Sequence, residues 1–223
     1  MKGLLKKDLL NLSSYKTSII ILVIFCAIAI IGSKSLSLVP IALPTIMGML
    51  VLATFNYDEA AKTDSYLLAL PITKKELVLS KYILAVIFLI LSAAFSIILT
   101  IVLANIIRMI QPSEAIAIDY DSLISTAFGG MFGISLIQSI QLPSIYKWGA
   151  EKGRIQMFIL IFILICIIAG IGTLVVNIGL PFAIDQFKAF FESYGLILLT
   201  VLIIVMYLVS YRISYRIVMK KDF

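Results

Sequence analysis

Long runs of apolar residues alternate with short polar connections along this chain. A helix that crosses a bilayer needs about 20 mostly apolar residues. Six segments meet this requirement, near residues 17–34, 36–55, 82–107, 122–142, 157–176 and 195–212. Because 62% of the 223 residues are hydrophobic and 13% are charged, a soluble fold could not bury this apolar surface. The pattern predicts an all-α, polytopic membrane protein whose single domain, 1–223, crosses the bilayer six times.

The positive charges are unevenly divided between the connections. Fifteen of the 18 Lys and Arg residues lie in the N-terminal arm, in the second and fourth connections, or at the C-terminus, whereas Lys34, Arg108 and Lys188 lie in the other connections. Cytoplasmic connections carry the excess of Lys and Arg. We therefore expect both termini in the cytoplasm. The net charge of +6 is explained by these clusters beside the spans, so no nucleic-acid partner is expected.

Two segments outside the spans are amphipathic. Residues 1–16 place Met1 and three leucines on one helical face and most lysines elsewhere, which predicts a helix lying on the membrane. The alternative for this arm is a positive topology signal without a fixed helix. Residues 177–193 carry phenylalanines and charges and are too short to span twice. They form either a re-entrant segment in the outer leaflet or an aromatic interfacial helix.

The connection between the second and third spans, residues 56–81, is too polar to enter lipid. Asp58 and Lys62 are spaced as a helical ion pair would be, and a proline follows that helix. Thr73 and Glu76 then have the spacing of a capping box, which starts a helix that runs into the third span. The pattern predicts an ordered, charged projection at the cytoplasmic face.

No catalytic constellation is recognisable. The chain contains no histidine, no aspartate in the middle of a span, and no G-x-x-x-x-G-K-[ST] loop. Both cysteines lie singly inside apolar runs, so neither a disulfide framework nor a metal site is expected. We expect a chain without catalytic residues, metal or cofactor of its own, whose energy source is a partner.

Small and polar residues inside the spans have two interpretations. Ser92, Ser96 and Thr100 share one face of the third span, where they could line a substrate path or allow close helix packing. Packing is the commoner role of such residues. Gly129 and Gly133 form a G-x-x-x-G pattern, extended by Gly130, that favours close helix contact within one chain or between two.

Two glutamines, Gln138 and Gln141, lie toward the cytoplasmic end of the fourth span. A wetted cavity or the membrane interface could accommodate them, and the nearby Pro143 and Lys147 favour the interface.

The stretches FNYDEAAKTDSY at 55–66 and LPITKKELVLSKY at 70–82, with the opening MKGLLKKDL, resemble the ABC-2 type permeases of small bacterial exporters. Within that family the chain looks most like permease subunits of phenol-soluble modulin exporters of Gram-positive bacteria. The resemblance implies a type V exporter-like fold in the bacterial plasma membrane, with an N-terminal interfacial helix. It also implies two separate ATPase subunits that bind ATP and Mg²⁺, and a second six-span permease, identical or paralogous.

The resemblance also implies where the ATPase is contacted. A coupling helix between the second and third spans would dock on it, and the connection between the fourth and fifth spans would add a smaller contact. Carried onto this sequence, the coupling contact comprises Tyr57, Asp58, Glu59, Lys62, Asp64 and Tyr66. The second contact comprises Lys147, Trp148 and Glu151, although Trp148 also suits an interfacial anchor.

These observations predict a permease that exports amphipathic peptides of the phenol-soluble modulin or antimicrobial type. Lipophilic drugs or lipids are the alternative substrates. A membrane scaffold or sensor that docks a cytoplasmic partner is the alternative function.

Overall fold

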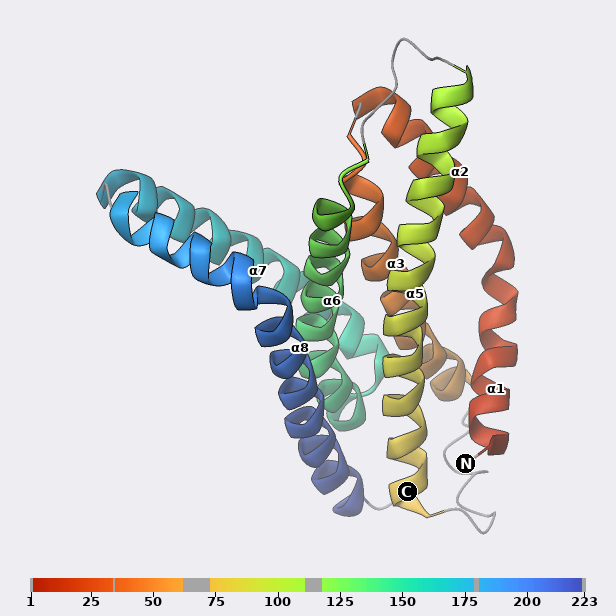
Figure 1. Cartoon of the computed structure of the whole chain (residues 1–223). Coiled ribbons are helices and arrows are strands. Elements are labelled where there is room, and N and C mark those ends of the chain that lie inside the picture. Colours follow the sequence, from red (N-terminus) through yellow and green to blue (C-terminus); the bar gives the residue numbers. More distant parts are fainter. Residues whose placement is uncertain (1, 34, 62–72, 111–117, 179–180, 222–223) are drawn as a thin grey trace.

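The computed structural model describes residues 2–33, 35–61, 73–110, 118–178 and 181–221, and in these ranges the regular elements are helical. Figure 1 shows helices gathered into an elongated bundle, from which α7 extends to one side. The elements are α1 (Lys2–Leu12), a 3₁₀ turn η1 (Ser13–Tyr15), α2 (Lys16–Ser33), α3 (Leu38–Ala60), α5 (Lys74–Ile110), α6 (Tyr120–Trp148), α7 (Ala150–Ile178) and α8 (Pro181–Met219).

Among the described residues, five helical stretches are long and apolar enough to cross a membrane. They are Gly3–Ile28, Leu38–Ala60, Lys74–Met109, Tyr120–Trp148 and Tyr194–Met219. The predicted span near 157–176 falls within α7 but is not one of these five stretches. The chain is therefore a multi-pass helical membrane protein, and the count of six spans stays a prediction.

The N-terminal arm is helical. α1 passes through η1 into α2, and the first candidate span begins at Gly3. Figure 1 shows α1 running along the side of the bundle, and α1 packs against α3 and α5. The placement of residues 1–16 on the membrane surface therefore stays a prediction. Residues 177–193 belong to the end of α7 and the start of α8, where the side chains are outside those described, so their re-entrant role is also still a prediction.

α6 lies at the centre of the bundle and packs most extensively against α3 and α8. A methyl group at Gly130 would lie 2.9 Å from the backbone oxygen of Ile41, so α3 approaches α6 closely only because Gly130 has no side chain. Gly129 and Gly133 have no described atom within 4 Å of their Cβ positions. The close contact within the chain thus uses Gly130, and not the predicted pair.

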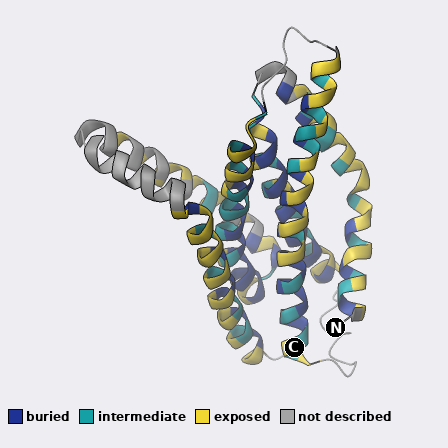
Figure 2. Cartoon of the chain, viewed as in Figure 1, coloured by how far each residue is buried: buried dark blue, intermediate teal, exposed yellow. Residues whose placement is uncertain are grey.

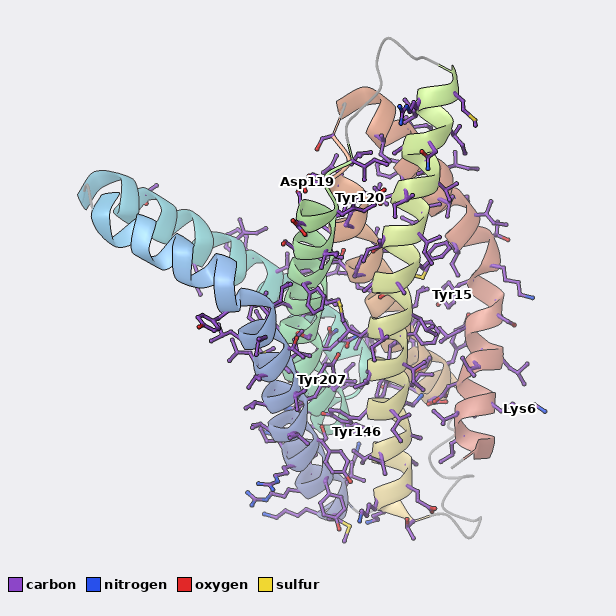
Figure 3. All side chains as sticks on the ribbon, in the orientation of Figure 1. Lys6, Tyr15, Asp119, Tyr120, Tyr146 and Tyr207 are labelled. Atoms are coloured by element: carbon purple, nitrogen blue, oxygen red, sulfur yellow. The ribbon has the colours of Figure 1, made fainter. Side chains whose placement is uncertain are left out.

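Polar side chains join the helices inside the bundle. Gln138 of α6 is fully buried, donates to the backbone oxygen of Gly48 in α3 at 2.7 Å, and accepts from the hydroxyl of Tyr207 in α8. Figure 3 shows Tyr207 on α8 beside α6. Gln138 is therefore enclosed by the bundle, where its amide has partners on two neighbouring helices, and its position at the depth of the membrane interface stays a prediction. The hydroxyl of Tyr82 in α5 pairs with Ser210 and Ser214 of α8, at 2.6 and 2.8 Å.

The two ends of the bundle differ in composition. At one end, α1 and α5 begin and α3, α6 and α8 finish (Figure 1); we call this the basic end. Lys221, the last described residue, accepts a hydrogen bond there from Lys74 Nζ at 2.8 Å. Toward the other end, where buried positions continue along the helices (Figure 2), an apolar cluster joins α2, α3, α5 and α6. Its buried members are Cys26, Ile30, Leu36, Val39, Leu43, Met47, Ala104 and Leu123.

Candidate functional site

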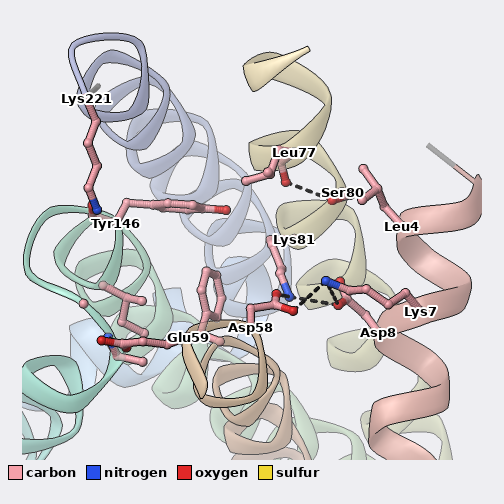
Figure 4. A pocket seen from close by; sticks show the side chains of 14 residues that line it. Leu4, Lys7, Asp8, Asp58, Glu59, Leu77, Ser80, Lys81, Tyr146 and Lys221 are labelled. Carbon is pink, nitrogen blue, oxygen red and sulfur yellow. Dashed lines mark hydrogen bonds and ion pairs between the residues drawn. The ribbon is translucent and has the colours of Figure 1, made fainter. Parts of the chain in front are cut away.

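Four charged side chains from three helices meet at the basic end. We call Lys7 and Asp8 of α1, Asp58 of α3 and Lys81 of α5 the charge cluster (Figure 4). Asp58 lies between the two lysines, with Oδ1 2.5 Å from Lys7 Nζ and Oδ2 2.6 Å from Lys81 Nζ. Lys81 Nζ is also 2.9 Å from Asp8 Oδ1. The cluster is electrically neutral.

The charge cluster is largely removed from solvent. Asp8 is 1% exposed and Lys81 is 4% exposed, whereas the side chain of Lys7 is 28% exposed. Buried charges are tolerated when they are paired and hydrogen-bonded. Lys81 Nζ meets this condition, because it donates hydrogen bonds to Asp8 and, at 2.9 Å, to Thr54 Oγ1, and forms an ion pair with Asp58. Lys81 of α5 therefore binds α1 through Asp8 and α3 through Asp58 and Thr54, and so joins the three helices.

Glu59, the neighbour of Asp58 in sequence, joins α3 to α7. Its Oε2 accepts a hydrogen bond from Ala150 N at 2.5 Å, at the N-terminus of α7 where the helix dipole favours a negative charge. Gly149 has φ of 91°, and a Cβ there would lie 2.9 Å from Glu59 Oε1, so only glycine fits. The last turn of α3 thus binds α1 and α5 through the carboxylate of Asp58, and α7 through the carboxylate of Glu59.

A cavity of about 140 Å³ opens between these elements, and Figure 4 shows the side chains that line it. Its lining includes the charge cluster, Glu59 and Lys221. Lys221 Nζ donates to the backbone oxygen of Tyr146 at 3.4 Å, which brings the end of α8 to the end of α6. Every helix that reaches the basic end therefore has a residue at or beside this cavity.

A family model described as ABC-2 family transporter protein matches residues 3–219. The chain belongs to the ABC-2 transporter family. No curated protein and no solved structure matches it. The match confirms the resemblance at the level of the family, and it supports a permease component that works with ATP-binding cassette ATPase subunits.

In this ABC-2 transporter chain, the predicted coupling residues have different environments. Tyr57 is 39% exposed and packs edge-to-face on Tyr15, with 6.1 Å between the ring centroids. Asp58 and Glu59 are engaged inside the chain, as described above. The remaining predicted residues lie outside those that the structure describes: Lys62, Asp64 and Tyr66.

The predicted capping box at the start of α5 is confirmed. Glu76 N donates to Thr73 Oγ1 at 3.2 Å, and Thr73 N donates to Glu76 Oε2 at 3.1 Å. These reciprocal bonds satisfy two backbone donors that the helix start leaves without partners. They fix where α5 begins, seven residues before Lys81.

The residues predicted for a second contact also lie at the basic end. Lys147, Trp148 and Glu151 are all exposed, around the turn from α6 to α7. Lys147 Nζ lies 4.7 Å from the Trp148 ring centroid, over its face. The half-exposed Trp148 ring suits both an interfacial anchor and a docking contact, so its role stays a prediction.

The predicted path residues Ser92, Ser96 and Thr100 are buried within the bundle. Each hydroxyl donates to a backbone oxygen of α5 itself: Ser92 to Leu89, Ser96 to Ala93, and Thr100 to Ser96, at 2.7 to 2.9 Å. This arrangement is typical of packing, and a substrate path along these residues stays a prediction.

Three members of the charge cluster carry no motif that would mark them as site residues. Lys7 and Lys81 belong, by sequence, to the positive segments that orient the chain. Two features of the sequence could have indicated the cluster. Asp8 is the acidic residue in the otherwise basic N-terminal arm, and Lys81 directly precedes the apolar run of the third span. Charged side chains so close to lipid need partners of opposite charge, and in the structure Asp8 and Lys81 pair with each other.

Proposed function

We propose that this chain is the permease subunit of an ATP-binding cassette exporter that moves amphipathic peptides, of the phenol-soluble modulin or antimicrobial type, out of a bacterial cell. Two separate ATPase subunits would bind ATP and Mg²⁺, and a second six-span permease, identical or paralogous, would complete the complex. The basic end would face the cytoplasm, as the distribution of Lys and Arg predicts. Membership of the ABC-2 family supports the permease role.

The observation that carries this proposal is the branched linkage at the end of α3. Asp58 is bonded to α1 and α5, and Glu59 is bonded to α7, immediately before the connection that would touch the ATPase. A displacement of that connection would therefore act on three further helices at once. ATP binding can shift the permease only if the ATPase binds its two conformations with different affinity. The junction of α1, α3, α5 and α7 would transmit a movement of the connection to these helices, and so couple ATPase binding to the conformation of the permease.

The docking surface itself would consist of exposed residues around this junction. Tyr57, Lys147, Trp148 and Glu151 are exposed at the basic end, and the connection that carries Lys62, Asp64 and Tyr66 begins there. In this proposal Asp58 and the exposed Glu59 transmit movement through their bonds to other helices, whereas the four residues named above make the contact. Aromatic residues are the commonest anchors of protein interfaces, so Tyr57 and Trp148 are the first to test.

The test is co-expression with the partner ATPase, followed by co-purification and by ATP-driven uptake of a labelled amphipathic peptide into inside-out proteoliposomes. Trp148→Ala and Tyr57→Ala are expected to weaken ATPase binding at least tenfold, as loss of an interface anchor does. Tyr120→Ala is the matched control, because Tyr120 is also an exposed aromatic residue but begins α6 at the opposite end (Figure 3). Equal ATPase binding by all three variants would contradict the docking surface.

A scaffold or sensor that binds a cytoplasmic partner without transport is the second candidate. The buried hydroxyls of Ser92, Ser96 and Thr100 favour it, since they offer no polar lining for a path in this conformation. The same proteoliposomes distinguish the candidates. Uptake of peptide that requires ATP excludes the scaffold, and uptake of a lipophilic dye or a lipid in place of the peptide reassigns the substrate.

A further inference from the structure

An apolar groove runs along the outside of the bundle between α5 and α8. Its volume is about 660 Å³. Residues 79–90 of α5 and 200–211 of α8 form its walls, with Phe128 and Met131 of α6. The one aliphatic hydroxyl of the lining, that of Thr200, donates to the Leu196 backbone oxygen at 2.7 Å. The groove therefore offers a ligand apolar surface along most of its length.

The part of the chain that the structure describes leaves this groove uncovered. Ile90, Ile204 and Leu208 are 57%, 53% and 58% exposed. The lining on α5 extends over residues 79–90, which is about 16 Å at the rise of an α-helix. One leaflet of a bilayer contributes about 15 Å of hydrocarbon, half of the total. The groove is therefore as long as one leaflet is thick.

The two ends of the groove differ in chemistry. Toward the middle of the bundle the lining is wholly apolar apart from Thr200 and consists mainly of aliphatic residues, with Phe128. Toward the basic end it becomes aromatic, where the Tyr82 and Tyr211 rings meet edge-to-face with centroids 5.5 Å apart and Tyr211 stacks on Tyr215. Tyrosines are typical of the headgroup level of a membrane, because their rings are apolar and their hydroxyls polar.

Two exposed cations stand at that aromatic end. Lys75 lies one helical turn before Leu79 on the same face of α5, and Arg212 directly follows Tyr211 on α8. Glu76, the acidic neighbour of Lys75, is turned back onto Thr73 by the capping box. Lys and Arg residues at the membrane surface attract anionic headgroups.

We propose that this groove binds one acyl chain of an anionic phospholipid from the leaflet at the basic end, with Lys75 and Arg212 beside the phosphate. The length of the groove, its apolar walls and the position of its cations at one end each match this occupant. An extended peptide is a poorer match, because its backbone groups would lie against these walls without partners. The lipid site does not depend on the proposed transport activity.

The test uses the purified full chain in detergent, titrated with phosphatidylglycerol or with phosphatidylcholine of the same acyl chains. Bound lipid is counted by native mass spectrometry. One phosphatidylglycerol molecule should be retained preferentially. Ile204→Trp fills the groove and should weaken this binding at least tenfold, and Ile204→Phe should weaken it less. Val205→Trp is the matched control, because Val205 is adjacent and 48% exposed but does not line the groove; it should bind as the unmodified chain does.

The headgroup contacts are tested separately. Lys75→Gln and Arg212→Gln should each reduce the affinity for phosphatidylglycerol about fivefold, the effect of one basic residue near a membrane surface, and leave that for phosphatidylcholine unchanged. Equal lipid retention by Ile204→Trp and Val205→Trp would overturn the proposal. So would a shift from dimer to monomer in Ile204→Trp with lipid retention unchanged, since the groove would then be an interface between two copies.

Discussion

The two ends of the bundle are held together by different forces. At the basic end, α1, α3 and α5 meet through the charge cluster, in which two lysines and two aspartates alternate at 2.5 to 2.9 Å. At the opposite end, α2 and α3 meet through an apolar cluster that includes Ile30, Val39 and Leu43. One end therefore depends on particular pairs of residues, and the other depends on shape and volume.

This difference has consequences for a protein that lies in lipid. Lipid tails are as apolar as Leu side chains, so burying Leu43 against Ile30 gains only packing and not the hydrophobic effect. The apolar end is therefore held by packing alone. Separating the helices costs more at the charge cluster, because moving α1 away from α3 would leave buried charges without partners. The basic end should therefore resist separation of its helices more strongly than the apolar end does.

The largest expected effect is that of removing one charge from the cluster. Lys81→Met leaves the buried Asp8 without its nearest partner and leaves two aspartates to share Lys7, so the expected loss of stability is about 3–5 kcal/mol. Reversible unfolding in mixed SDS micelles measures it. Lys6→Met is the matched control, because Lys6 lies next to the cluster in sequence but is exposed and points away from the bundle (Figure 3).

The same variant allows a second comparison. Combining Lys81→Met with Asp58→Leu removes one charge of each sign and leaves Lys7 beside Asp8, 3.5 Å apart. Replacing a buried ion pair with apolar residues is often nearly neutral, so the double variant should be more stable than Lys81→Met alone. If the double variant were the less stable of the two, the cluster would not act as a set of compensating charges.

A smaller effect is expected at the apolar end. Leu43 is fully buried there, and Leu43→Ala should cost about 2 kcal/mol, the low end of the range for such cavities, since lipid replaces water as the surrounding solvent. Leu43→Met keeps the volume and should cost less than about 1.5 kcal/mol. The unfolding assay in micelles measures both. A loss for Leu43→Ala as large as that for Lys81→Met would remove the distinction between the two ends.

The sequence predicted those parts of the structure that depend on local patterns. Helices cover the described residues of the predicted spans except residues 36 and 37, which precede α3, and Thr73 and Glu76 form the expected capping box. The charge cluster was not predictable in this way, because Asp8, Asp58 and Lys81 are separated by 50 and 23 positions and only helix packing brings them together. Gln138 illustrates the same limit: its position near a span end suggested the interface, whereas its partners Gly48 and Tyr207 lie on two other helices.

The smallest expected effect concerns the capping box of Thr73 and Glu76. Its bonds join residues three positions apart, whereas the charge cluster joins residues far apart in the sequence. Thr73→Ala removes the hydroxyl that accepts from Glu76 N, and the cost of losing such a cap corresponds to roughly fivefold faster amide hydrogen exchange in the first turn of α5. Lys75→Ala, in the same turn but outside the box, should exchange as the unmodified chain does. Because Thr73 is exposed, water can replace its lost bonds, and the effect should stay within that turn and leave Lys81 protected. Faster exchange that extended to residues around Lys81 would mean that the cap and the charge cluster form one cooperative unit. The stability of the basic end would then depend on Thr73 as well as on the four charged residues.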